Sequence, residues 1–190
     1  MTTTIPSRTP VRDRRRGFTL VEIMIGAGLG AFLLAAVLST FLFMGRSGAN
    51  LRNYSDMEAQ ARTALELFAE DSRQASAITW NSSSSVTLTV IGVAVTYAYD
   101  SSAKTFSRTA SGSTRTLITG ITSGTFTFTA YNVNGTSLSL ASASDCTASS
   151  ASTKQIQISL QAQRTNTTVV AATNTVLSAR FILRNKVVTA

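Results

Sequence analysis

A single carboxylate stands in the most apolar part of this sequence. Glu22 is the one charged residue between Phe18 and Met44, a stretch of 27 residues. An ionised side chain near the start of a membrane span is costly, and such residues commonly mark a function. The rest of the sequence therefore has to supply the reason for Glu22.

The side chains that usually carry catalysis or bind metals are scarce elsewhere. The chain has no histidine, which removes Ser–His and Cys–His nucleophile activation and the commonest metal ligand. After residue 80 the only carboxylates are Asp100 and Asp145, too few for a calcium site or a paired-carboxylate hydrolase unless they meet in one cleft. The lone Cys146 cannot form an intrachain disulfide, and we interpret it as an inert or incidental thiol rather than a nucleophile or an intersubunit bridge. We predict no enzymatic activity, no cofactor and no metal site.

The element that positions Glu22 is a predicted membrane-spanning helix. Residues Phe18 to Met44 would form a helix about 40 Å long, which exceeds a hydrocarbon core of about 30 Å. The stretch is also longer than the apolar region of a secretory signal peptide. Three arginines precede it and Arg46 follows it. Because the more positive flank stays in the cytoplasm, we predict an inner-membrane protein with a cytoplasmic N-terminus and a periplasmic head.

The residues around Glu22 form a recognisable motif. Gly17-Phe18-Thr19-Leu20-Val21-Glu22, after a basic leader and before an apolar helix, resembles the class III signal of type IV pilins and type II secretion pseudopilins. The resemblance implies that prepilin peptidase cuts between Gly17 and Phe18 and that Phe18 is then N-methylated. It assigns recognition of the leader to Arg14, Arg15 and Arg16.

The resemblance also gives Glu22 a role. After cleavage, Phe18 carries a cationic amine one helical turn from Glu22. In a filament, the Glu22 carboxylate of one subunit can neutralise the amine of the next and set the axial register. The alternative is that Glu22 reaches the membrane interface or pairs within its own chain.

Small residues within the span bear on helix packing. Gly26 and Gly30 form a Gly-xxx-Gly pair that lets helices approach closely, although glycines are also simply tolerated in membrane helices. No proline follows Pro10, whereas many major pilins carry a helix-kinking proline in the span. Residues 60–75 resemble the stem of J- or W-type minor pilins. These features, with the missing disulfide pair, favour a minor subunit.

An amphipathic pattern continues the helix beyond the span. Good helix formers dominate, and apolar residues recur near helical spacing, so we predict one nearly continuous helix from about Phe18 to Ile78. Its apolar stripe is expected to pack on the head. The stripe consists of Leu51, Tyr54, Met57, Ala61, Leu65, Phe68, Ala75 and Ile78.

After Trp80 the pattern changes to alternation, which predicts strands. The expected strands are 86–90, 93–99, 104–109, 115–121, 125–131, 154–164 and 175–183, with a hairpin turn at Ile91-Gly92 and a polar loop over 141–153. The predicted fold class is α+β, a long N-terminal helix packed on a β-rich, mainly antiparallel head. The expected parts are a leader (1–17), a span (18–45), a stem (46–80) and a head (81–190).

The head has an excess of basic residues, which leaves a binding hypothesis open. Arg180, Arg184 and Lys186 are the candidates for a patch that holds DNA or another anionic ligand, against a scattered solvated surface. Sparse aromatic residues nearby make nucleic-acid binding the less favoured reading.

The predicted function is structural. We expect a subunit of a type IV pilus or type II secretion pseudopilus, a minor initiating or tip pilin. Its partners would be prepilin peptidase, other pilin or pseudopilin subunits and the inner-membrane assembly platform. The alternatives are a major pilin, a filament-tip adhesion or DNA-binding module, and an unprocessed membrane-anchored envelope protein.

Overall fold

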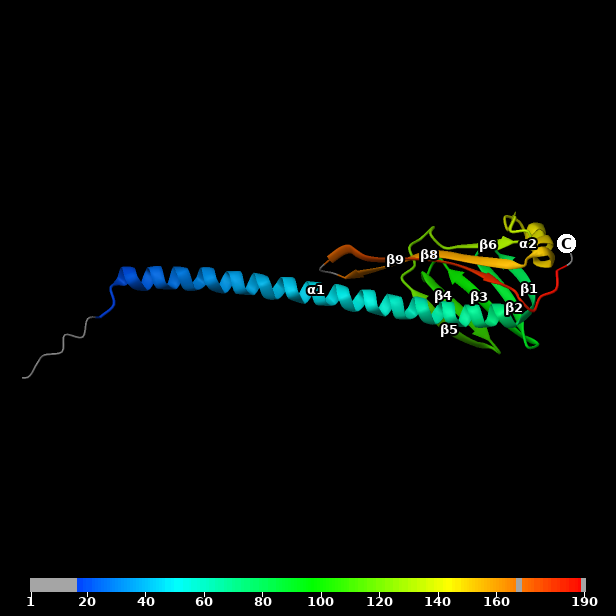
Figure 1. The fold of residues 1–190 in the computed structure, drawn as a ribbon. Helices are drawn as coiled ribbons and strands as arrows, with labels where there is room; N and C mark the ends of the chain where they lie inside the picture. The colour runs from blue at the N-terminus through cyan, green and yellow to red at the C-terminus, as the bar shows by residue number, and fades with distance from the viewer. Residues whose placement is uncertain (1–16, 167–168, 189–190) are drawn as a thin grey trace, which may run out of the picture. The chain divides into compact units, whose positions relative to one another are not determined.

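The structure, a computed structural model, describes residues 17–166 and 169–188 (Figure 1). The chain divides into two units, with the boundary between Gly45 and Arg46. Helix α1 (Leu20–Gln74) contributes to both units, and every strand belongs to the second. The α+β class, with a long N-terminal helix packed on antiparallel sheets, is confirmed.

The first part of α1 is long and apolar enough to cross a membrane. Its large side chains are exposed in the structure, from Leu20 to Met44. Beyond residue 50 the helix has a buried face formed by Met57, Ala61, Ala64, Phe68, Asp71 and Ser72. Leu51 and Tyr54, which were expected on that face, are 71% and 50% exposed.

The helix ends at Gln74, so the prediction that it reaches Ile78 is wrong. Ala75–Ser82 is a strand, β1, paired antiparallel with β2 (Ser85–Val90). Ile78 and Trp80 are buried on one face of β1, while Thr79 between them is exposed. The spacing of Ala75 and Ile78 fits a helix by chance, whereas the β-branched and aromatic residues that follow suit a pleated strand.

Two antiparallel sheets make the rest of the second unit. The first has the order β1-β2-β3-β4-β5, and the second has the order β7-β6-β8-β9. The remaining strands are β3 (Val93–Asp100), β4 (Thr105–Ala110), β5 (Ser113–Thr119), β6 (Thr127–Tyr131), β7 (Ser137–Leu138), β8 (Gln155–Asn166) and β9 (Val169–Ile182). Six of the seven predicted strands are confirmed within two residues at each end, as is the Ile91-Gly92 turn. The seventh, predicted over 175–183, is β9, which begins six residues earlier at Val169. β1 and the short β7 were missed.

The polar segment 141–153, predicted to be a loop, is mostly helix. Helix α2 spans Ala143–Ser152 and is capped by Ser142, whose Oγ accepts from the Asp145 amide at 3.1 Å. Its Ser- and Thr-rich sequence has low helix propensity. Contacts with β1 stabilise it instead: Ser150 Oγ accepts from the Trp80 amide at 2.8 Å, and Cys146 is buried beneath it.

The core gathers around Phe68, which is fully buried. Its ring lies edge-on to Tyr97 of the first sheet, with 4.8 Å between the ring centroids, and edge-on to Phe181 of the second, with 5.2 Å between them. It stacks on Phe128 with 6.1 Å between the ring centroids. The helix therefore packs against strands of both sheets through one aromatic residue.

Candidate functional site

The site predicted from the sequence lies where α1 begins. Thr19 directly precedes the helix, and its amide and hydroxyl donate to Glu22 Oε2 at 2.9 and 3.0 Å. In return, Thr19 Oγ1 accepts from the Glu22 amide at 3.2 Å. This reciprocal arrangement is a capping box, which satisfies backbone donors that a helix start leaves unpaired. The carboxylate of Glu22 thus helps to determine the residue at which the helix begins.

The bond between Gly17 and Phe18 lies just outside this capped helix. Residues 17–19 have no regular secondary structure, and Phe18 is 83% exposed. A Cβ placed on Gly17 would meet no atom within 4 Å. An exposed, non-helical peptide bond next to a rigid helix is accessible to a peptidase. Arg14, Arg15 and Arg16 lie outside the described residues.

The comparison with known families matches the same segment. A family described as the prokaryotic N-terminal methylation motif matches residues 12–38. The chain therefore carries the N-terminal motif of type IV pilin-like prepilins. No curated protein and no solved structure matches it.

The motif supports a precursor of a pilin or pseudopilin, and it implies processing by prepilin peptidase and assembly with other pilin subunits. The family is structural rather than enzymatic. The apolar first part of α1 fits membrane anchoring. The match ends at residue 38, so it says nothing of the head.

The two glycines proposed for helix packing in the apolar part of α1 are unobstructed. Gly26 and Gly30 lie four residues apart in α1 and therefore on one face. No heavy atom lies within 4 Å of a Cβ built on either. The backbone on that face is open to a neighbouring helix.

The structure does not gather the three basic residues proposed for an anionic-ligand patch. The Arg180 guanidinium lies 3.6 Å from the centre of the Tyr131 ring and donates to Gln157 Oε1 at 3.3 Å. Arg184 is exposed, but Lys186 is only 7% exposed. Of the three residues, only Arg180 and Arg184 face the solvent.

Lys186 has a structural role that the sequence did not suggest. Its Nζ donates to the carbonyls of Ser150, Ala151 and Thr153 at 2.5, 2.9 and 2.9 Å. These carbonyls stand at the C-terminal end of α2, where a cation also complements the helix dipole. Lys186 thereby ties the C-terminal segment to α2.

The burial of Lys186 makes stability depend on pH. Burial, helped by the nearby Lys154 ammonium, lowers the pKa of Lys186 to about 8. An unfolded lysine titrates near 10.4, so between these values the unfolded chain binds the proton that the native chain has lost. Stability should therefore rise with pH from 8 to 9.5 in urea titrations, by less than the roughly 1.4 kcal/mol per pH unit that the release of one full proton gives. Lys186→Met should abolish the rise; an unchanged slope would contradict this.

A buried ion pair was missed by the sequence analysis. Arg108 Nε and Nη2 donate to the two Asp71 carboxylate oxygens at 2.7 and 3.3 Å, and the Tyr97 hydroxyl donates to Asp71 Oδ2 at 2.5 Å. Burial, with the Asp71 carboxylate beside it, raises the pKa of Tyr97, which keeps it a neutral donor. Asp71 follows Phe68 by three residues and therefore lies on the same, apolar face of the helix. A carboxylate on that face was the signal from which a buried partner could have been predicted.

Proposed function

We propose that prepilin peptidase cleaves this chain between Gly17 and Phe18, that Phe18 is N-methylated, and that the product is a structural subunit of a type IV pilus or type II secretion pseudopilus. The observation that carries the proposal is the exposed Gly17–Phe18 bond, followed at once by a capped helix. The leader residues Arg14, Arg15 and Arg16 would present this bond to the peptidase. The proposed parts are leader 1–17, span 18–45, stem 46–80 and head 81–190.

Assembly would use the apolar surface of the first unit. Between Phe18 and Met44, large apolar side chains are 51–83% exposed, among them Phe32 at 72% and Phe41 at 68%. Lipid covers this surface in the membrane, and neighbouring helices would cover it in a filament. Gly26 and Gly30 would allow close approach, and Glu22 would neutralise the Phe18 amine of an adjacent subunit.

The basic leader supports a cytoplasmic N-terminus and a periplasmic head before assembly. The absence of a proline after Pro10 and of a disulfide pair supports a minor, initiating or tip role. Counting copies per filament by mass spectrometry separates this role from that of a major pilin.

Processing is tested by the mass and first residue of the protein from its native host. We expect a chain that begins at methylated Phe18 and lacks residues 1–17. A Gly17→Val variant should keep the leader, because the side chain stands at the scissile bond. Gly28→Ala is the control, since Gly28 also has open space around it and should leave cleavage intact. Retention of Met1 in cells with active peptidase would refute the proposal.

A further inference from the structure

A short stretch of α1 has a sequence that disfavours a helix. Residues 45–50 read Gly-Arg-Ser-Gly-Ala-Asn. Glycine, serine and asparagine are all less favourable than alanine in the interior of a helix, glycine most of all, and they supply four of these six residues. Sharp kinks in helices that lack proline often occur at neighbouring glycine and serine residues. We call residues 45–50 the link.

In a membrane, lipid supports the helix before the link. The first part of α1 is long and apolar enough to cross a membrane. In hydrocarbon, a backbone group that leaves its helical partner finds no water, so a spanning segment stays helical despite its glycines. This support covers Gly26, Gly28 and Gly30. It does not reach the link, which follows the apolar part and where water can pair with the backbone.

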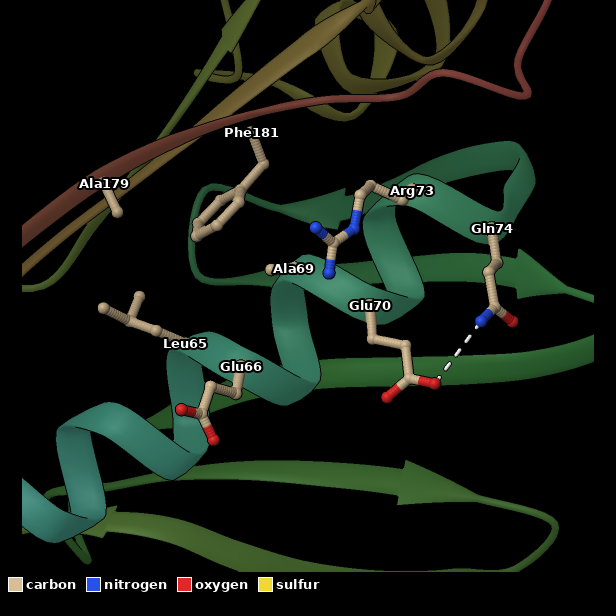
Figure 2. Close-up of a pocket in the computed structure, with 8 residues that line it drawn as sticks. All are labelled: Leu65, Glu66, Ala69, Glu70, Arg73, Gln74, Ala179 and Phe181. Atoms are coloured by element: carbon tan, nitrogen blue, oxygen red, sulfur yellow. Dashed lines mark hydrogen bonds between the residues drawn. The ribbon is translucent and has the colours of Figure 1, made fainter.

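Packing on the head supports the helix after the link. Met57 is the first buried residue of α1, and the buried face continues to Ser72. Leu65 and Ala69 face Phe181 of β9 across one hollow (Figure 2). Most of the stability of helices in proteins comes from such packing. This part of α1 therefore has a support that does not depend on lipid.

The link has neither support. A Cβ built on Gly45 or Gly48 would meet no other part of the chain within 4 Å, and none of residues 45–56 is buried. In the part of the chain that the structure describes, the first ion pair of α1 joins Arg62 to Glu66, beyond the link. The boundary between the two units of the chain also falls here, after Gly45. Few contacts of any kind therefore oppose local unwinding of the link.

We propose that the link is a hinge: residues 45–50 unwind and re-form locally while the helix on both sides of them persists. Local openings of this kind cost much less free energy than global unfolding, and they occur where buried contacts are few. The two units of the chain are then joined by a pliable connection instead of a rigid rod. A head on such a connection can change its orientation to the membrane without breaking any contact in its core.

The hinge requires only that the apolar part of α1 lies in lipid. Cleavage after Gly17, methylation of Phe18 and assembly are not needed for it. In the proposed function, the hinge would let the head turn as the subunit passes from membrane to filament, and this use rests on that proposal. Measurements on the unassembled chain in lipid therefore distinguish a failed hinge from failed processing or assembly.

Hydrogen exchange of the full chain in lipid nanodiscs tests the unwinding. We expect the amides of the link to exchange about a hundredfold faster than those of residues 61–70, which packing protects. Gly45→Ala combined with Gly48→Ala should slow exchange of the link about 20-fold, because each replacement favours the helical form about fivefold. Gly28→Ala is the control in the lipid-covered part and should leave the link unchanged. Equal protection of the link and of residues 61–70 would overturn the proposal.

Distances between spin labels test whether unwinding of the link bends the helix. In a Cys146→Ser background, labels at Ala36→Cys and Ser55→Cys lie on either side of the link. Labels at Ser55→Cys and Gln74→Cys lie the same number of residues apart, after the link. We expect a broad distribution of distances for the first pair and a narrow one for the second, and the two alanine replacements in the link should narrow the first. A first pair as narrow as the second without those replacements would refute the hinge.

Discussion

A Glu22→Gln variant is expected to be cleaved after Gly17 and held in the membrane, yet to be absent from filaments. Glutamine replaces glutamate in capping boxes, so the hydrogen bonds with Thr19 can persist. It carries no charge, so it cannot neutralise the Phe18 amine of a neighbour. An unpaired cation among packed helices would then oppose assembly.

The comparison with Glu22→Ala decides between the two roles of this residue. If Glu22 only caps α1, the glutamine variant should assemble and the alanine variant should suffer. If it neutralises a neighbour, both should fail alike. The measurement is the amount of processed subunit in sheared filaments relative to the membrane fraction. Normal assembly of Glu22→Gln would exclude the neutralisation role and leave capping within its own chain.

Replacing Asp71 by alanine should cost the head about 3–5 kcal/mol of unfolding free energy. The Asp71 side chain is 9% exposed and that of Arg108 26%. Removing the carboxylate leaves the partly buried Arg108 guanidinium and the Tyr97 hydroxyl without their acceptor. The loss of a buried ion-pair partner is among the few single changes with effects of this size.

Urea unfolding of the detergent-solubilised chain measures this effect. The chain has one tryptophan, Trp80, which is buried and reports on the head. Glu66→Ala is the matched control, because it also removes a helix carboxylate paired with arginine, but at an exposed site. Such surface pairs contribute about 0.5 kcal/mol or less. Similar unfolding midpoints for both variants would show that the Asp71 pair does not hold the stem to the sheets.

The fold was largely predictable because its signals are local. Alternation marked the strands, and Ile91-Gly92 marked a hairpin. The errors lie where distant contacts override local preference. Residues 143–152 are helical because Ser142, Trp80 and Lys186 satisfy their polar groups, and no window of sequence contains all three.

The candidate functional residues also separate into those that a local motif predicts and those that only the fold brings together. Gly17, Phe18 and Glu22 form one contiguous motif, so the sequence suffices to find them. The Asp71–Arg108 pair joins residues 37 apart, and only the fold brings them together. Lys186 was misassigned to a surface patch because sequence gives the charge of a lysine but not its burial.

Lys186 also offers a way to measure local unfolding of the head. The chain has only three lysines, at 104, 154 and 186. Lys104 is exposed, Lys154 is half-buried, and Lys186 is covered while its ammonium is bound to α2. An amine-reactive label can therefore modify Lys186 only after the C-terminal segment detaches, whereas it modifies Lys104 at once. The ratio of the two labels over time reports local unfolding of the C-terminal segment without any substitution in the chain, and it could be read in intact filaments.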